Sequence, residues 1–308
     1  MTDYLDLTIV VPTTKDRSIL LYNLVDSLDT TKITIKEIIV IGHEELDIPQ
    51  SNHKIRYIKV NVNNASIKRN TGIKNACTDY ILFIDDDCYV KGMFLDRLVR
   101  VLKKHEHKNT NAWGFALNVV RDTSTNELDI GYLKSGMDHY FKHTGNKGLV
   151  ERFEHTTWAP TAGLIVRKDA IKKSFPINTD VSVGGEDVIF GWENSTANRN
   201  YLYCLKEINV YHVPITHSNI DILKHKAYLY GKSEYYIWEH LRGAEDIIKY
   251  ISVKRSMKEL IYAYVRYPRL NIEKTLANEF IKGTALAFIK KGNWPLRLSL
   301  TKLATYKF

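Results

Sequence analysis

Three consecutive aspartates, Asp85, Asp86 and Asp87, directly follow an apolar segment at residues 80–84. Side chains alternate between the two faces of an extended chain, so Asp85 and Asp87 are expected to share a face where the strand ends. Carboxylate oxygens are preferred ligands of Mg²⁺ and Mn²⁺, and two of them leave room for a diphosphate. A turn or a helix cap would need only one aspartate. Because three together concentrate like charge at a cost that a cation would remove, the segment predicts a metal site.

A second acidic pair, Glu186 and Asp187, follows Gly184 and Gly185. The two glycines permit unusual backbone angles, and the acids fall at the expected start of a helix. A carboxylate held on such a loop suits a general base, which must accept a proton from a substrate hydroxyl. The alternative is that one of the two acids only caps the helix and complements its dipole.

Strands and helices alternate along the first half of the chain, and they would position these acids. Apolar strands are expected at residues 7–11, 37–41, 55–60 and 80–84. Helices are expected over residues 19–28, 65–76 and 95–102, the first from the periodic apolar residues Ile19, Leu20, Leu21, Leu24, Val25 and Leu28. Such alternation predicts an α/β fold with a mostly parallel sheet flanked by helices. Ligands of these sheets bind at the carboxyl ends of the strands, where the triple aspartate lies.

Four segments in this order resemble the family 2 glycosyltransferases, which have the Rossmann-like GT-A fold. They are residues 10–13 (VVPT), 65–72 (AS with RNTG), 83–87 (FIDDD) and 184–187 (GGED). The resemblance extends from residue 7 to about residue 240. It implies transfer of a sugar from a nucleotide diphosphate donor to an acceptor hydroxyl, with inversion at the anomeric carbon, in glycan or polysaccharide assembly.

The resemblance also implies roles for the acids. Breaking the bond between sugar and diphosphate leaves negative charge on the leaving group, which a bound Mn²⁺ or Mg²⁺ would offset. Asp87 is the first metal ligand, with Asp85 beside it, and Asp86 lies near the donor ribose. Asp187 would take the proton from the attacking hydroxyl, while Glu186 would orient the acceptor.

A histidine is often the third metal ligand in relatives of this fold. Residues 208–212 resemble the strand that precedes it, which makes His212 the preferred ligand and His217 the alternative. Order in the chain is the only link between His212 and the aspartates. A histidine that merely forms a hydrogen bond near the sheet therefore stays open.

The nucleotide is expected to contact the ends of the first two strands. Pro12 and Thr13 would place backbone groups against the base, and Arg69 would meet ribose or phosphate. Many members of the family end the second strand with an acidic pair that binds uracil, and here Glu44 could substitute. Arg17 either contacts the diphosphate or lies in the first turn of a helix. A UDP-sugar is the first expectation for the donor, on family frequency alone, and the acceptor is expected to be a glycan or a lipid-linked molecule.

The net charge of +9 is concentrated at one end of the chain. Residues 241–308 carry 14 Lys and Arg against 5 Asp and Glu, so residues 1–240 sum to zero. We therefore expect a catalytic domain over residues 1–240 and a basic amphipathic helical region over residues 241–308. The basic region suits peripheral contact with an anionic membrane, or it is a helical subdomain packed on the core. No nucleic-acid motif accompanies the charge, so no nucleic-acid partner is expected.

The expected location is cytoplasmic, and the basic region adds the option of a peripheral position at the inner face of the membrane. Cys77, Cys88 and Cys204 lack the spacing of a disulfide framework or a zinc site, which indicates a reducing compartment. The start of the sequence lacks the features of a signal peptide, and no apolar run reaches the ~18 residues of a membrane span.

Two other functions are open from the sequence. A nucleotidyltransferase would carry a glycine-rich loop after the first strand, but residues 11–17 (VPTTKDR) contain no glycine. A non-catalytic module that binds membrane or anionic glycan through the basic region is the second alternative. The intact acidic motifs favour an enzyme over that module.

Overall fold

The structure is a computed structural model that describes six segments and four single residues of the chain. These are residues 4–30, 33–107, 112–122, 154–177, 185–213 and 220–240, and residues 279, 282, 283 and 286. The chain divides into two compact units. The first, here called the sheet unit, comprises Met1–Asp122, His143–Phe175 and Phe190–Val213. The second unit comprises Thr123–Lys142, Pro176–Ile189 and Pro214–Phe308.

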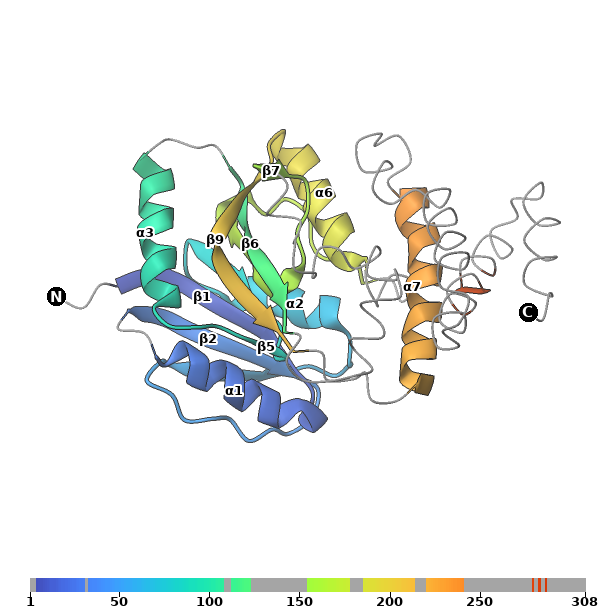
Figure 1. Cartoon of the computed structure of the whole chain (residues 1–308), viewed down its shortest axis with the longest axis horizontal. Coiled ribbons are helices and arrows are strands. Elements are labelled where there is room, and N and C mark those ends of the chain that lie inside the picture. The colour runs from blue at the N-terminus through green and yellow to red at the C-terminus, as the bar shows by residue number, and fades with distance from the viewer. Residues whose placement is uncertain are drawn as a thin grey trace. The chain divides into compact units, whose positions relative to one another are not determined.

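The sheet unit contains one mixed sheet whose strand order is β3-β2-β1-β4-β8-β6-β9-β5, with β7 beside β9 (Figure 1). Parallel pairing joins β1 to β2 and β4, β2 to β3, and β6 to β9. Antiparallel pairing joins β8 to β4 and β6, and β5 and β7 to β9. The strands are β1 Tyr4–Pro12, β2 Thr34–Gly42, β3 Ile55–Lys59, β4 Tyr80–Phe83, β5 Cys88–Tyr89, β6 Gly114–Arg121, β7 His155–Thr156, β8 Leu164–Arg167 and β9 Leu202–His212. The predicted mostly parallel sheet flanked by helices is confirmed.

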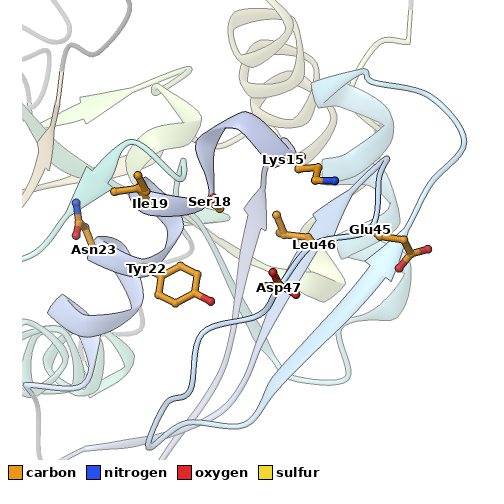
Figure 2. A pocket seen from close by; sticks show the side chains of 8 residues that line it. All are labelled: Lys15, Ser18, Ile19, Tyr22, Asn23, Glu45, Leu46 and Asp47. Carbon is orange, nitrogen blue, oxygen red and sulfur yellow. The ribbon is translucent and has the colours of Figure 1, made fainter.

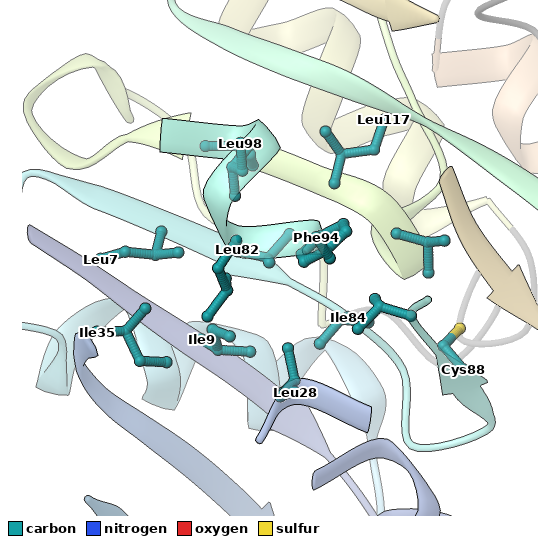
Figure 3. Packing of buried hydrophobic residues seen from close by; sticks show 14 of the residues in the cluster. Leu7, Ile9, Leu28, Ile35, Leu82, Ile84, Cys88, Phe94, Leu98 and Leu117 are labelled. Atoms are coloured by element: carbon teal, nitrogen blue, oxygen red, sulfur yellow. The ribbon is translucent and has the colours of Figure 1, made fainter. Parts of the chain in front are cut away.

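Helices cover both faces of this sheet and bury one hydrophobic cluster on each. These helices are α1 Ser18–Leu28, α2 Ala65–Asn75, α3 Phe94–His107 and α6 Glu186–Asn198, with short 3₁₀ turns η1 Lys15–Arg17, η3 Thr161–Gly163 and η4 Lys168–Ala170. The helix α7 Ile220–His240 belongs to the second unit. One cluster includes Leu28 of α1 and Leu98 of α3 (Figure 3). The other includes Phe190 of α6, with Ile73 of α2 packed against it. Burial on both faces explains why the strands are continuous apolar runs rather than alternating ones.

The first helix differs from expectation at one residue. Leu21 and Leu28 are fully buried as predicted, but the side chain of Ile19 is 76% exposed. At 100° per residue, Ile19 lies nearly opposite both of them on the helix, so it cannot join the stripe that faces the sheet. The apolar character of Ile19 therefore has no explanation in the core of the protein.

The expected basic region at residues 241–308 falls almost wholly outside the described residues, as does His217. The domain boundary at residue 240 and the membrane contact therefore stay predictions. Among the helices that the structure describes, none has both the length and the apolar character needed to span a membrane.

Gly72 of α2 marks the closest approach between that helix and the sheet. A Cβ atom added there would lie 2.4 Å from Cγ1 and 2.8 Å from Cγ2 of Val10, a fully buried residue of β1. Real Cβ atoms do not approach other atoms so closely, so a larger residue would force α2 away from the sheet.

Gly72→Ala is therefore expected to lower the free energy of unfolding by roughly 1–3 kcal/mol, the usual cost of overpacking. Helix propensity alone would make the same change stabilising, so a loss of stability would show that the close packing dominates. Urea unfolding followed by circular dichroism measures the difference, with Lys74→Ala on the exposed side of α2 as the control. A Gly72→Ala protein as stable as the wild type would contradict the close packing.

Candidate active site

The triple aspartate lies in a turn between β4 and β5. Strand β4 ends at Phe83, before the first aspartate, and the amide of Cys88 closes the turn by donating to the carbonyl of Asp85 over 3.1 Å. The alternation of a strand therefore does not set the directions of the three carboxylates, contrary to the reasoning from sequence. Each carboxylate has its own partners instead.

Asp85 is held by α2. The guanidinium of Arg69 donates to Oδ1 of Asp85 over 2.8 Å, and Arg69 itself is almost fully buried. The structure thus brings Arg69, which the sequence assigned to donor binding, into contact with a predicted metal ligand. It gives Asp85 a protein cation as its partner, and the role of Asp85 as a metal ligand stays a prediction.

Asp86 is the most deeply buried of the three, with 1% of its surface exposed. Thr13 donates to its Oδ2 over 2.7 Å, and Nη1 of Arg17 lies 3.0 Å from its Oδ1. Burial raises the pKa of Asp86 to about 7, although Arg17 and Thr13 both favour the charged form. Loss of solvation outweighs these contacts because a nearly inaccessible carboxylate gives up most of its hydration. Near neutral pH, Asp86 can therefore donate or accept a hydrogen bond.

Asp87 has the opposite electrostatic character. Burial alone would raise the pKa of Asp87, but His212 and Arg17 together hold it well below its usual range. Arg17 donates to Oδ2 of Asp87, while Nε2 of His212 lies 3.4 Å from Oδ1. Asp87 consequently stays a charged carboxylate.

Strand pairing brings His212 to this position. Cys88 of β5 lies opposite His212 of β9 in an antiparallel pair, and the amide of Val213 donates to the carbonyl of Asp87 over 2.7 Å. The end of β9 is thereby fixed against the acidic turn. The sequence placed both residues in one site by resemblance, and the structure places them in contact.

The donor set of Asp87 and His212 fits a divalent cation. Oδ1 of Asp87 is buried, and apart from Nε2 of His212 at 3.4 Å it has no hydrogen-bond partner among the described residues. No group of three His, Cys, Asp or Glu side chains in the described part of the chain could hold a metal ion by itself. Magnesium in nucleotide sites is commonly held by one or two carboxylates and completed by phosphate oxygens and water, so a set this small is sufficient.

The sequence reasoning missed Lys68, a buried lysine on α2. Its amine donates to the carbonyl of Thr13 and to Oδ1 of Asn63, each over 2.7 Å. Burial lowers the pKa of Lys68 to about 8. Because Thr13 in turn donates to Asp86, Lys68 fixes the turn that orients this carboxylate. The signal in the sequence was that residues 65–75 contain few large apolar side chains for a helix expected to pack on a sheet.

The RNTG segment of α2 has a separate contact for each residue. Besides the bond of Arg69 to Asp85, the side chain of Asn70 accepts from the amide of Phe175 and donates to its carbonyl, over 2.8 and 2.9 Å. Thr71 donates to the carbonyl of Ile67 within the helix. The segment therefore joins the acidic turn, the chain at Phe175 and the sheet through one helix.

Comparison with known proteins agrees with this arrangement. The profile of "Glycosyl transferase family 2" matches residues 8–175, more than half of the chain. The chain belongs to glycosyl transferase family 2. No curated protein matches it by sequence.

The fold of this family 2 chain is similar to that of solved structures at low identity. The structure of S. aureus TarS 1-349 in complex with UDP is 16% identical, covers 92% of this chain and 83% of its own, and has a TM-score of 0.51. The structure of the same protein in complex with UDP-GlcNAc is 15% identical, covers 91% of this chain and 82% of its own, and has a TM-score of 0.51. The structure of the mannosyltransferase PcManGT from Pyrobaculum calidifontis, in complex with GDP-Man and Mn²⁺, is 13% identical. It covers 98% of this chain and 81% of its own, and has a TM-score of 0.50. In a longer structure of TarS the matched part is 55% of that chain. These similarities confirm the fold.

The sequence at the end of β2 differs from the family pattern. The amide of Thr13 donates to the carbonyl of Ile41, which places the turn after Pro12 beside this end. The side chain of Glu44 is half exposed, and its Oε2 lies 3.6 Å from Nε2 of His43. Contact of these groups with the donor base stays a prediction for this family 2 member.

The predicted catalytic pair begins α6 and belongs to the second unit. Oε2 of Glu186 accepts from the amide of Gly185 over 3.0 Å, and Oδ1 of Asp187 accepts from the amide of Val188 over 2.8 Å. A Cβ on Gly185 would lie 2.6 Å from Cδ1 of Ile237, so α7 packs closely against this turn. Both acids lie in the first turn of α6, where negative charge complements the helix dipole, and the role of Asp187 as a base stays a prediction.

The raised pKa of Asp86 makes stability depend on pH. Between about pH 4 and about pH 7 the folded protein holds a proton on Asp86 that the unfolded chain has released. The contribution of Asp86 to stability is therefore present below this range and is lost as the pH rises through it. Asp86→Asn cannot ionise, so we expect it to gain stability relative to the wild type by roughly 1 kcal/mol or more between about pH 5 and about pH 8.

Urea unfolding at the two pH values measures this change, and Asp169→Asn at an exposed position is the matched control. A difference between Asp86→Asn and wild type that does not vary with pH would show that Asp86 is ionised throughout.

Proposed function

We propose that this family 2 glycosyltransferase uses a divalent cation to transfer a sugar from a nucleotide diphosphate donor to an acceptor hydroxyl, with inversion. The observation that carries the proposal is the pairing of Asp87 with His212. Asp87 keeps its charge, and its buried Oδ1 lies 3.4 Å from the imidazole of His212 at the carboxyl end of the sheet. A carboxylate and an imidazole, both side-chain types that bind divalent cations, would thus meet a ligand where ligands of such sheets bind.

Asp87 and His212 would hold Mn²⁺ or Mg²⁺, and when bound the cation would offset charge on the departing nucleotide diphosphate. Arg17 favours the deprotonated form of Asp87, which is the form that a metal ligand must have. PcManGT, solved with GDP-Man and Mn²⁺, supports the choice of metal by its similar fold.

The donor would lie over the ends of β1 and β4. Asp86, with its pKa near neutrality, suits a ribose hydroxyl that can be either donor or acceptor. Thr13 and Pro12 would line the base, Arg69 would meet ribose or phosphate, and Glu44 would approach the base from β2. UDP is the first choice of nucleotide, supported by the UDP and UDP-GlcNAc complexes of TarS.

Arg17 is better suited to holding carboxylates than to binding the diphosphate. Its two terminal nitrogens contact Asp86 and Asp87, and its side chain is only 31% exposed. Occupying one oxygen of Asp87 leaves the other directed at His212. Arg17 would therefore orient the metal ligand.

Asp187 would be the general base and Glu186 would orient the acceptor. A single displacement needs one base to take the proton as the new bond forms, and it inverts the anomeric carbon. The close packing of Gly185 against Ile237 supports a fixed position for this turn within the second unit.

We include a glycan or lipid-linked acceptor in this proposal, and peripheral membrane contact through residues 241–308. The support for the contact is the charge of +9 carried by those residues.

Asp87→Ala is expected to abolish Mn²⁺-dependent binding of UDP, whereas His212→Ala weakens it, because the carboxylate supplies the charge and the imidazole only a second ligand. Isothermal titration of UDP, with Mn²⁺ and with chelator, measures both. Asp169→Ala, an exposed carboxylate outside the site, is the control. Unchanged affinity in Asp87→Ala would remove the metal assignment.

Asp187→Asn is expected to keep the fold and the affinity for nucleotide but to lower turnover by roughly 10²-fold or more, because the amide cannot accept the proton. Glu186→Gln should raise the KM for acceptor instead. Steady-state kinetics separate the two effects, and NMR of the product gives the anomeric configuration. Retained configuration, or near-normal turnover in Asp187→Asn, would refute this mechanism.

A further inference from the structure

A cavity of about 710 Å³ opens beside α1, and its lining includes neither the three aspartates nor the residues that contact them. Figure 2 shows the side chains that line it, from the start of α1 and from the loop after β2. They are Lys15, Ser18, Ile19, Tyr22, Asn23, Glu45, Leu46 and Asp47. None of them is assigned to the donor, the metal or the reaction above.

Two apolar side chains on this helix are exposed without a role in the core. Ile19 is 76% exposed and Tyr22 is 39% exposed, and they lie one helical turn apart. The half-buried Leu46 lines the cavity with them. Single exposed apolar residues are ordinary, but an aromatic and two aliphatic side chains that line one cavity indicate a binding surface.

The polar groups of the cavity define the chemistry of a ligand. Glu45 forms an ion pair with Lys59 over 2.7 Å, and among the remaining lining residues Lys15 balances Asp47. The cavity therefore has no excess charge to attract phosphate or other anions, which suits a neutral ligand. Carboxylates accept hydrogen bonds from hydroxyl groups, and the amide of Asn23 both donates and accepts them. An aromatic face next to such groups matches a sugar ring, which has apolar C–H faces and hydroxyl edges.

The cavity adjoins the acidic turn through η1. Lys15 begins this 3₁₀ turn and Arg17, which contacts Asp86 and Asp87, ends it. A chain bound in the cavity would therefore lie beside the site of transfer without occupying it. The volume is within the range of pockets that enclose drug-sized ligands, which suits a short oligosaccharide.

We propose that this cavity binds a neutral segment of the acceptor glycan. Identifying the bound glycan as the acceptor rests on the proposed function. The binding of a neutral oligosaccharide in this cavity does not depend on it. Tyr22 stacks on a sugar ring, and Asp47 and Asn23 accept hydrogen bonds from its hydroxyl groups.

An array that displays neutral, sialylated and phosphorylated oligosaccharides tests the inference with fluorescently labelled full-length protein. The wild type should bind neutral glycans in preference to anionic ones. Tyr22→Ala should weaken this binding roughly tenfold, the equivalent of one lost aromatic contact, while Tyr22→Trp should retain it. Asp47→Ala should weaken binding through loss of the hydrogen bonds. Tyr201→Ala is the matched control, since Tyr201 is 53% exposed and lies outside the cavity.

Absence of neutral glycan binding, a preference for anionic glycans, or wild-type binding by Tyr22→Ala would each overturn the inference. Titration of the wild type with UDP-sugars and Mn²⁺ tests the proposed function separately. If glycan binding is present while donor binding is absent, the proposed transferase function would be refuted. The assignment of the cavity to a neutral glycan would still stand.

Discussion

The ion pairs of Arg17 with Asp86 and Asp87 are the interaction on which the arrangement of the site depends. Three adjacent carboxylates in a mostly buried turn would repel one another and lose their hydration. Arg17 and Arg69 offset that cost with protein charge, from a 3₁₀ turn and from α2. The crowding of aspartates is thus balanced within the protein before any metal is considered. The features that favour a metal are instead the buried Oδ1 of Asp87 and the imidazole of His212 beside it.

Asp86 and Asp87 are adjacent and identical in type, but their environments in the structure suit them to different roles. Burial dominates at Asp86 and raises its pKa to about 7, while the contacts with His212 and Arg17 dominate at Asp87 and lower its pKa. One carboxylate is thereby suited to hydroxyl groups and its neighbour to a cation. Different pKa values for adjacent acids commonly accompany a division of roles in enzyme sites.

Helix α2 connects this electrostatic arrangement to the sheet. It buries polar residues because its inner face meets the site: Lys68 fixes the carbonyl of Thr13, Arg69 holds Asp85, and Gly72 permits close contact with Val10. Helix α1 has a conventional apolar face toward the sheet, and its outer residues Ile19 and Tyr22 line a cavity. Two helices of the same length thus serve the site in different ways, one through its buried face and the other through its exposed face.

The sequence by itself determined the class of fold, the approximate limits of most elements in the first half, the order of the acidic motifs and the family. Strand and helix periods and short motifs are local properties, so they can be read along the chain. Only the tertiary structure decided that Asp85 pairs with Arg69, that Lys68 is buried under Thr13, and that Ile19 faces solvent. The contact of His212 with Asp87 also required the antiparallel register of β5 with β9, which joins residues 124 positions apart. Such contacts depend on long-range pairing and on the competition between burial and charge, and neither is encoded in the spacing of residues along one segment.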